Sequence, residues 1–415
     1  MKLTPEEQDM LRGAEGEAAR RAIEIVVTLG RIYDAERLLP VQSVQVAGVS
    51  YRNLGDAALD FLREWAAQGA RVRVPTTLNP AGMDMIRWRR MGISEAFAKK
   101  QSEVVAAYTA MGIQPTCTCT PYFVGNAPGY GQSIAWSESS AVCFANSVLG
   151  ARTNREGGPS ALASAICGRT AEFGLQLAAN RRATRRVEVR CAVREPHEFA
   201  ALGYLIGRQV RDGIPYFTGI ELPAISPDDP LSAAPDVLDK LKLLGAALAS
   251  SGAVALYHIA DVTPEAQLTP DLCLPEAPTL IVDSLGPAYE ALNAPIADID
   301  LVVIGCPHAS LGELHQVAEG LRDQCLTSDL WVTTARETRN RAEALGYVQA
   351  IEEAGGLVVA DGCVVVAPMS ELRYRTLATN SAKMAYYALP HAGLQVRFGS
   401  LERCLSAAIS GRWES

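Results

Sequence analysis

Cys306 stands where a side chain can do chemistry. It directly follows the apolar run Leu301–Gly305, whose β-branched residues and closing glycine predict a buried strand that stops at the glycine. Ser310 and Glu313 have the spacing of a capping box, which predicts a helix beginning near residue 311. Ligands bind at the carboxyl ends of strands in open α/β sheets, and a helix N-terminus favours the thiolate form of a nearby cysteine. The alternative is a small cysteine packed in the core.

Two further loops carry cysteines. Cys117 and Cys119 lie in the long loop Thr116–Tyr130, and loops of this length in compact domains are often functional. Cys363 follows an Asp-Gly pair, which also suits a hairpin turn whose cysteine faces the core. Thiolates from three converging loops would suit an iron–sulfur cluster, but spacing along the sequence does not establish that the loops converge.

Several small polar loops have the character of anion-binding sites. The segment Asn154–Ser160, NREGGPS, joins an arginine to a flexible backbone and a predicted helix start, a combination that can cradle a carboxylate or a phosphate. The alternative is a capped helix start with a surface arginine. Lys383 in ATNSAK can bind an anion or act as an acid if it is desolvated, whereas a solvated lysine is the commoner case. Glu138 in WSESS has the alternative of an ordinary helix-start carboxylate. The sequence contains no Walker loop, dinucleotide fingerprint, Gly-x-Ser-x-Gly elbow or zinc-finger spacing.

The elements that must position these loops alternate between amphipathic helices and apolar strands. The patterns predict helices at 15–29, 54–69, 94–111 and 139–149, and from residue 186 onward seven apolar runs, from VEVRCAV to LVVADGCVVVAP, predict strands. This alternation predicts an α/β fold with parallel or mixed sheets flanked by helices. We expect three domains, 1–185, 186–285 and 286–415, with a proline-rich linker near residue 275.

Composition narrows the class of protein. The 415 residues are 48% hydrophobic and 20% charged, as in a well-packed soluble protein. The net charge of −8 and the short, scattered basic clusters argue against a nucleic-acid binder. The N-terminus lacks an apolar signal core, and the longest apolar region is interrupted by Ser-Ser-Gly, so we expect no membrane span. Ten scattered cysteines without the spacing of a disulfide scaffold favour a reducing cytoplasm.

Together, the motifs CTCTPYFVGNAPGYGQ, VIGCPHASL, DGCVVVAP, TNSAKMAYY and TTLNPAGMDM resemble the large, catalytic chain of the aconitase X family over nearly the whole sequence. The resemblance implies an aconitase-like, multi-domain fold with the active site at a domain junction. It also implies dehydration of a small hydroxy acid with an iron–sulfur cluster of the two-iron (2Fe-2S) or four-iron (4Fe-4S) type. It carries the cluster ligands onto Cys119, Cys306 and Cys363, with Cys119 in place of Cys117 because it directly precedes Thr-Pro-Tyr. We expect Glu138 and Lys383 to be catalytic, and we expect the substrate to be bound by Ser43, Asn79, Asn154, Arg155 and Ser381.

The resemblance leaves two substrates open. Bacterial members resemble cis-3-hydroxy-L-proline dehydratases, which form Δ1-pyrroline-2-carboxylate, and archaeal members resemble mevalonate 5-phosphate dehydratases. The Ala- and Arg-rich, lysine-poor composition indicates a bacterial source, so we expect hydroxyproline. The large-chain motifs finish close to the end of the sequence, so we also expect a separate small swivel-domain subunit that supplies a serine as the base. The alternatives from other classes are a zinc-dependent hydrolase that uses the same cysteines and a non-catalytic binding protein.

Overall fold

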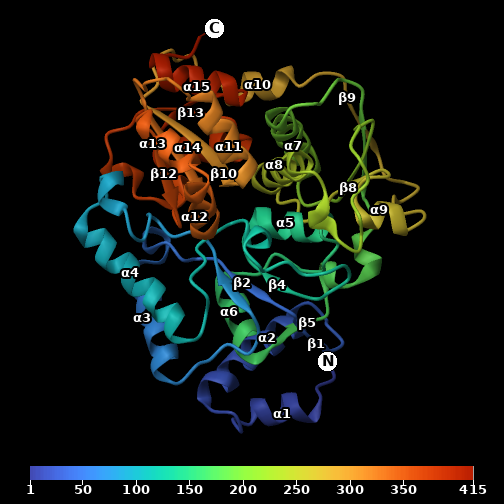
Figure 1. Cartoon of the computed structure of the whole chain (residues 1–415). Coiled ribbons are helices and arrows are strands. Elements are labelled where there is room, and N and C mark those ends of the chain that lie inside the picture. Colours follow the sequence, from blue (N-terminus) through green and yellow to red (C-terminus); the bar gives the residue numbers. More distant parts are fainter. Residues whose placement is uncertain (415) are drawn as a thin grey trace.

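The computed structural model describes residues 1–414, which form four β-sheets surrounded by helices (Figure 1). The helices are α1 (Pro5–Leu11), α2 (Glu17–Ile32), α3 (Tyr51–Ala67), α4 (Glu95–Ala110), α5 (Ser139–Ser147), α6 (Gly158–Cys167), α7 (Pro196–Val210), α8 (Pro235–Ser251), α9 (Pro264–Leu268), α10 (Gly286–Leu292), α11 (Leu311–Gly320), α12 (Arg336–Ala344), α13 (Tyr347–Glu353), α14 (Ala382–Ala392) and α15 (Leu401–Ser410). The strands are β1 (Leu38–Pro40), β2 (Val44–Val46), β3 (Thr76–Leu78), β4 (Ala135–Trp136), β5 (Arg169–Ala171), β6 (Arg185–Val189), β7 (Pro215–Thr218), β8 (His258–Ile259), β9 (Thr279–Val282), β10 (Leu301–Ala309), β11 (Asp329–Thr334), β12 (Leu357–Ala360), β13 (Thr376–Thr379) and β14 (Gln395–Phe398). The predicted α/β class with helix-flanked parallel sheets is confirmed.

The N-terminal part of the chain contains the parallel sheet β3-β2-β4 and the antiparallel pair β1-β5. Helix α6 packs on β2, and α2 packs on α6. The helix predicted at 94–111 is confirmed as α4, and Ser94 caps it, because its hydroxyl accepts a hydrogen bond from the Phe97 amide at 3.3 Å. Strands β2 and β3 are only three residues long, because the chain turns at their carboxyl ends into loops that line the site described below.

The C-terminal part is built on the parallel sheet β12-β11-β10-β13-β14. Helices lie on both faces of this sheet, so its central strand β10 is buried along its whole length, as expected for parallel sheets. The strand was predicted to stop at Gly305, but it resumes beyond an irregular register and continues to Ala309. Gly305 makes the irregularity possible: its φ is +94°, and a Cβ there would lie 2.1 Å from the Thr333 carbonyl oxygen. Cys306 therefore lies in a bulge within a strand, not in a turn after it.

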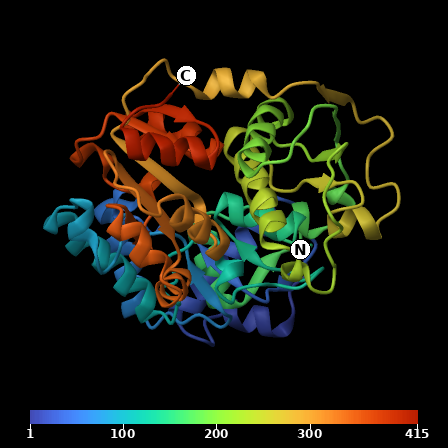
Figure 2. The same ribbon diagram turned by 45° about the horizontal axis from the view of Figure 1, so that its top comes forward.

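A third unit, which lies between these two in the sequence, contains the parallel sheet β8-β7-β6-β9 with helices α7 and α8. Helix α7 packs closely on α8 because Gly203 faces it, where a Cβ would lie 2.6 Å from the Leu244 carbonyl oxygen. Helix α8 in turn contacts β10 and α14, so it lies beside the five-stranded sheet (Figure 2).

Two local predictions in this half of the chain are wrong. The proline-rich segment near residue 275 is not a linker between units, because β9, which follows it, pairs with β6 inside the middle sheet. The run after Cys363 is not a strand: Val364–Val366 forms a 3₁₀ turn, and no hairpin forms there.

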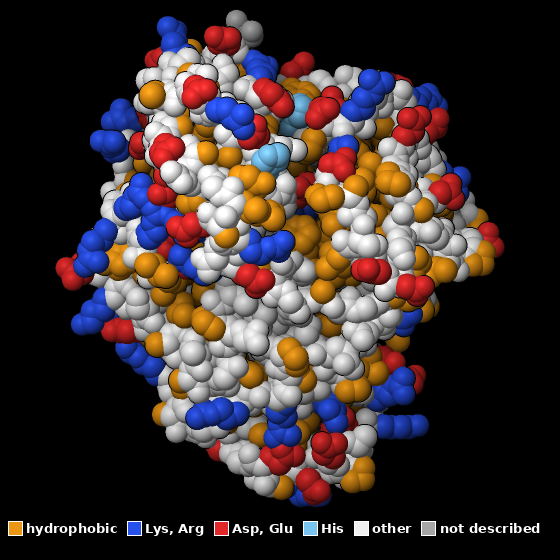
Figure 3. All heavy atoms as spheres, in the orientation of Figure 1, with side chains coloured by type: hydrophobic (Ala, Val, Ile, Leu, Met, Phe, Trp, Pro, Cys, Tyr) orange, Lys and Arg blue, Asp and Glu red, His pale blue; other side chains and the backbone are white. Residues whose placement is uncertain are grey.

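The surface carries both signs of charge. On the face shown in Figure 3, Lys and Arg are interspersed with Asp and Glu. Within residues 1–414, no helix combines the length and the apolar character that a bilayer crossing requires.

Candidate functional site

A cavity of about 270 Å³ lies between the N-terminal part of the chain and the C-terminal part with the five-stranded sheet, and all three predicted cluster cysteines line it. Cys119 comes from the loop after α4, Cys306 from the bulge of β10, and Cys363 from the loop after β12. Each thiol is buried and lies close enough to the other two for their charges to interact. The structure thus brings together three side chains that are far apart in the sequence, while their role as ligands stays a prediction.

The backbone of Cys306 is held from two sides. The Thr333 hydroxyl donates to the Gly305 carbonyl oxygen at 2.5 Å, which fixes the bulge before the cysteine. The Ser381 hydroxyl donates to the Cys306 carbonyl oxygen and accepts from the Met384 amide at 3.1 Å as the cap of α14. Ser381 was predicted to bind substrate, but both of its hydrogen bonds are structural and it does not line the cavity.

The Cys363 loop is fastened to the loop after β3. The Cys363 amide donates to the Ala81 carbonyl oxygen at 3.2 Å, and Gly362 lies so close to the same loop that a Cβ would be 2.8 Å from the Met83 carbonyl carbon. The Arg336 guanidinium pairs with both Asp84 and Asp361, so it joins the two loops behind the cysteine. This docking explains why an Asp-Gly pair precedes Cys363.

His308 joins all three cysteine loops. Its backbone amide donates to Cys119 Sγ at 3.2 Å. Its Nδ1 lies 3.0 Å from the Thr118 hydroxyl, and its Nε2 lies 2.9 Å from the Gly362 carbonyl oxygen. Because a carbonyl only accepts, Nε2 carries the proton, and Nδ1 accepts from Thr118. Burial lowers the pKa of His308 to about 4, which keeps the ring neutral in this arrangement. Sequence analysis did not find this role, because lone histidine spacing gives no signal for it.

The thiols themselves are protonated in the absence of a bound cation. Burial raises the pKa of Cys119 and Cys363 to about 12 and that of Cys306 to about 11. The helix begins at Leu311 as predicted, but the expectation that its N-terminus would hold Cys306 as thiolate is wrong without a bound metal, because burial dominates at the cysteine. A thiolate here requires the compensating charge of a metal centre.

A buried ion pair lies beside the thiols. Lys383 Nζ lies 2.6 Å from Glu138 Oε1 and 3.1 Å from the Ser140 hydroxyl. Burial opposes the charge on the lysine, but Glu138 and the thiols of Cys306 and Cys119 raise the pKa of Lys383 above its usual range. Burial alone would raise the pKa of Glu138, but Lys383 and hydrogen bonds to its carboxylate lower it. Both groups are therefore charged at neutral pH.

The rest of the cavity wall suits an anion. Arg155 is exposed and makes no ion pair within residues 1–414, so its guanidinium is free to bind a ligand. The first turns of three helices contribute Asn53 of α3, Ser139 of α5 and Lys383 of α14, and helix N-termini favour negative charge. Asn79 lines the same wall, and its Oδ1 has no hydrogen-bond partner among the described residues 1–414.

Two other predicted substrate-binding residues lie elsewhere. The buried Ser43 hydroxyl accepts from the indole Nε1 of Trp136 at 3.2 Å, which is a packing role in the sheet. The Asn154 side chain donates to the Phe173 carbonyl oxygen and accepts from the Leu175 amide, so it fixes a loop. Lining residues that sequence analysis did not select include Asn53, Ser137, Ser139 and Tyr387. The serine-rich WSESS motif contains Ser137 and Ser139 and so indicated these two, whereas no sequence pattern indicated Asn53 or Tyr387.

The thiols are not gathered around one point. Among residues 1–414, no set of three or more His, Cys, Asp or Glu side chains is arranged to hold a single metal ion. The three cysteines line the wall of one cavity instead.

Three family models match the chain, and together they cover most of it. They are described as the first, second and third domains of aconitase X, and they match residues 1–179, 183–281 and 299–410. The solved structure of Thermococcus kodakaraensis aconitase X in its holo form is similar, with a TM-score of 0.89 and 43% sequence identity over 98% of this chain and 100% of that one.

Curated relatives fall into two groups by name. The phosphomevalonate dehydratase large subunit of Methanothermobacter thermautotrophicus is 50% identical over 94% of each chain, and that of Methanocaldococcus jannaschii is 44% identical over 98% of this chain and 99% of the relative. The cis-3-hydroxy-L-proline dehydratase of Pseudomonas aeruginosa is 38% identical over 98% of this chain and 70% of the relative.

Proposed function

This chain belongs to the aconitase X family of dehydratases, and on that premise we propose that it forms the large subunit of an enzyme that removes water from mevalonate 5-phosphate. The sequence-based preference for hydroxyproline is not supported, because relatives named for phosphomevalonate are 38–50% identical whereas those named for hydroxyproline are 33–38% identical. The amino-acid composition that favoured hydroxyproline reports the source of a protein and not the shape of its pocket.

The observation that carries the proposal is the anion-binding wall of the cavity. Mevalonate 5-phosphate has a carboxylate at one end, a phosphate at the other and a tertiary hydroxyl between them. Arg155, which no carboxylate neutralises within residues 1–414, suits the phosphate because a guanidinium donates two parallel hydrogen bonds. The charged Lys383, at the start of α14, suits the carboxylate. Hydroxyproline carries an ammonium group, which this wall of cations does not favour.

We propose that Cys119, Cys306 and Cys363 hold an iron–sulfur cluster at this site. The fit rests on three buried thiols around one cavity that do not converge on a single ion, which favours a cluster over the alternative of a zinc centre. When bound, such a cluster supplies a Lewis-acidic iron that assists departure of the hydroxyl. The charge of the cluster also offsets the burial that otherwise keeps the thiols protonated.

Other roles belong to the protein's own side chains. Glu138 keeps Lys383 charged and aimed at the cavity through their 2.6 Å contact. His308 holds the three cysteine loops in register, and Tyr387 and Val365 give one side of the cavity an apolar wall. Burial of these groups excludes water and strengthens their charge interactions.

The proposal includes a small subunit. The phosphomevalonate relatives are named large subunits, and we propose that a swivel-domain partner closes the cavity and supplies the base. Residence in the cytoplasm and the domain division at residues 185 and 285 stay predictions from the sequence.

The decisive experiment is anaerobic co-expression with a candidate small subunit, followed by incubation with each substrate and detection of the products by NMR. We expect loss of water from mevalonate 5-phosphate and none from cis-3-hydroxy-L-proline. Dehydration of hydroxyproline alone would overturn the substrate assignment and leave the family assignment intact.

A further inference from the structure

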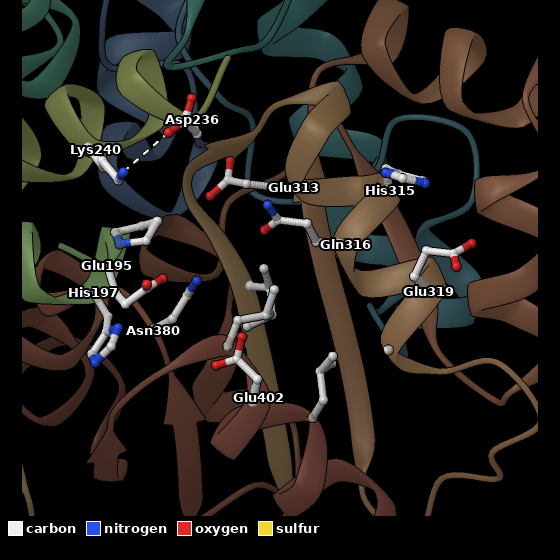
Figure 4. Close-up of a pocket in the computed structure, with 15 residues that line it drawn as sticks. Glu195, His197, Asp236, Lys240, Glu313, His315, Gln316, Glu319, Asn380 and Glu402 are labelled. Atoms are coloured by element: carbon white, nitrogen blue, oxygen red, sulfur yellow. Dashed lines mark hydrogen bonds and ion pairs between the residues drawn. The ribbon is translucent and has the colours of Figure 1, made fainter. Parts of the chain in front are cut away.

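A second, larger cavity of about 600 Å³ lies between the middle unit and the five-stranded sheet (Figure 4). Helices α7, α8, α11 and α15 contribute its walls, and Asn380 and Ile304 contribute to its floor. Its polar lining includes Glu195, Asp236, Lys240, Glu313, Asn380 and Glu402. No residue that lines the cavity of the three cysteines lines this one.

Two polar side chains in this cavity are deeply buried and have capacity left for a ligand. Asn380 is only 6% exposed, and its side-chain amide makes no hydrogen bond within residues 1–414. Glu313 is 7% exposed; its Oε2 pairs with Lys242 and accepts from the Ser310 amide, whereas its Oε1 accepts no hydrogen bond from the described chain. Figure 4 shows both side chains at the cavity. The polar atoms of Asn380 are not enclosed in the protein interior but are open to the cavity, so their hydrogen-bonding capacity is available to an occupant.

The charges of the lining favour a cation as the occupant. Five carboxylates line the cavity, and the one lining ammonium, that of Lys240, is already paired with Asp236 at 3.2 Å. Glu402, on the α15 wall, makes no ion pair within residues 1–414. The amide oxygen of Asn380 accepts hydrogen bonds, which suits an ammonium donor.

The size and layout of the cavity favour an organic cation over a metal ion. Calcium and magnesium require compact cages of oxygen ligands, and no such cage of acidic side chains exists within residues 1–414. The volume falls in the range of small-molecule sites, and the carboxylates are spread over four helices. We propose that this cavity binds an aliphatic polyamine, whose separated ammonium groups match the separated carboxylates.

The cavity shares backbone with the dehydratase site. Asn380 directly precedes Ser381, which donates to the Cys306 carbonyl oxygen, and Ile304 directly precedes the Gly305 bulge. A polyamine bonded to Asn380 therefore restrains the segment that positions Cys306, which gives a route from this cavity to the site.

The test is isothermal titration of the purified chain, with any partner that co-purifies, using spermidine at low ionic strength. We expect one saturable site per chain and at least a tenfold weaker affinity in E402K. E276K is the matched control, because it makes the same charge change at an exposed residue that does not line the cavity, and we expect its affinity to stay within twofold. N380L keeps the net charge and should also weaken spermidine binding. Only its binding is compared, because Asn380 adjoins Ser381 and the substitution can also disturb the segment that positions Cys306.

Three results would overturn the proposal. One is the absence of saturable spermidine binding, and another is an equal loss of affinity in E402K and E276K, which would indicate general attraction to an anionic surface. The third is binding of MgCl₂ alone with the same affinity and the same dependence on Glu402, which would assign the cavity to a metal ion.

Discussion

The buried cluster of Asp239, Lys242 and Glu313 should make the stability of the protein depend on pH in a defined direction. Lys242 Nζ lies 2.8 Å from Asp239 Oδ1 and also pairs with Glu313, so two carboxylates share one ammonium between α8 and α11. Burial, together with the charge of Asp239, raises the pKa of Glu313 to about 7 from its ordinary 4.5, although Lys242 opposes the rise. The folded protein therefore keeps a proton that the unfolded chain releases.

The direction and the size of this pH dependence follow from the difference between the folded and unfolded pKa values of Glu313. A carboxyl group whose pKa is raised by folding contributes stability below its unfolded pKa and loses it as the pH rises through the folded value. A rise from 4.5 to about 7, at about 1.4 kcal/mol for each pH unit, corresponds to about 3 kcal/mol, lost between pH 4.5 and pH 7. D239N removes the competing carboxylate, so we expect it to lose most of this pH dependence and to gain stability relative to the wild type at pH 8.

The assay is the urea midpoint of wild type and D239N at pH 5, 6, 7 and 8 in one ionic strength. D236N is the matched control, because Asp236 lies one turn away on α8 with its side chain 56% exposed, and we expect its curve to follow the wild type. Parallel wild-type and D239N curves across this range would refute the reasoning, because Asp239 would then not raise the Glu313 pKa.

Three further changes have expected outcomes. R155M removes a charge-assisted contact to the phosphate worth about 2 kcal/mol, so KM for mevalonate 5-phosphate should rise about 30-fold in steady-state assays. R152M is the control, because Arg152 lies outside the cavity and its substitution should leave KM unchanged. Equal KM values for R155M and the wild type would remove Arg155 from the site. E265Q leaves the buried Arg181 without its carboxylate and should lower the free energy of unfolding by about 3–5 kcal/mol, measured by denaturant titration; a change below about 1 kcal/mol would show that the pair is dispensable. G362A places a Cβ against Met83 and should displace the Cys363 loop. We expect less bound iron than in the wild type after anaerobic reconstitution. Full iron content would show that the loop adapts to the added methyl group.

The sequence predicted the helices and the meeting of the three cysteine loops better than it predicted individual polar contacts. Helix caps such as Ser310 are local, so their spacing sufficed. The prediction that Cys119, Cys306 and Cys363 form one site came from the family resemblance, because no local pattern relates loops that are far apart in the sequence.

The failures have a common physical origin in long-range packing. The course of β10 past Gly305 depends on Thr333 of the neighbouring strand, and the bonding of Asn154 depends on a loop some twenty residues later. Whether Ser43 faces the cavity or Trp136 is decided by the packing of the sheet, and the protonation of Cys306 is decided by its burial. None of these can be computed from neighbouring letters in the sequence.

The most direct test of the central claim is the iron and acid-labile sulfide content of anaerobically purified protein, with the visible spectrum, in wild type and single cysteine-to-serine variants. We predict that C119S, C306S and C363S each lose the iron and the visible absorbance together. C117S should keep both, because Cys117 is buried in the same loop as Cys119 but does not line the cavity. Full iron content in C119S, or equal loss in C117S and C119S, would contradict the account.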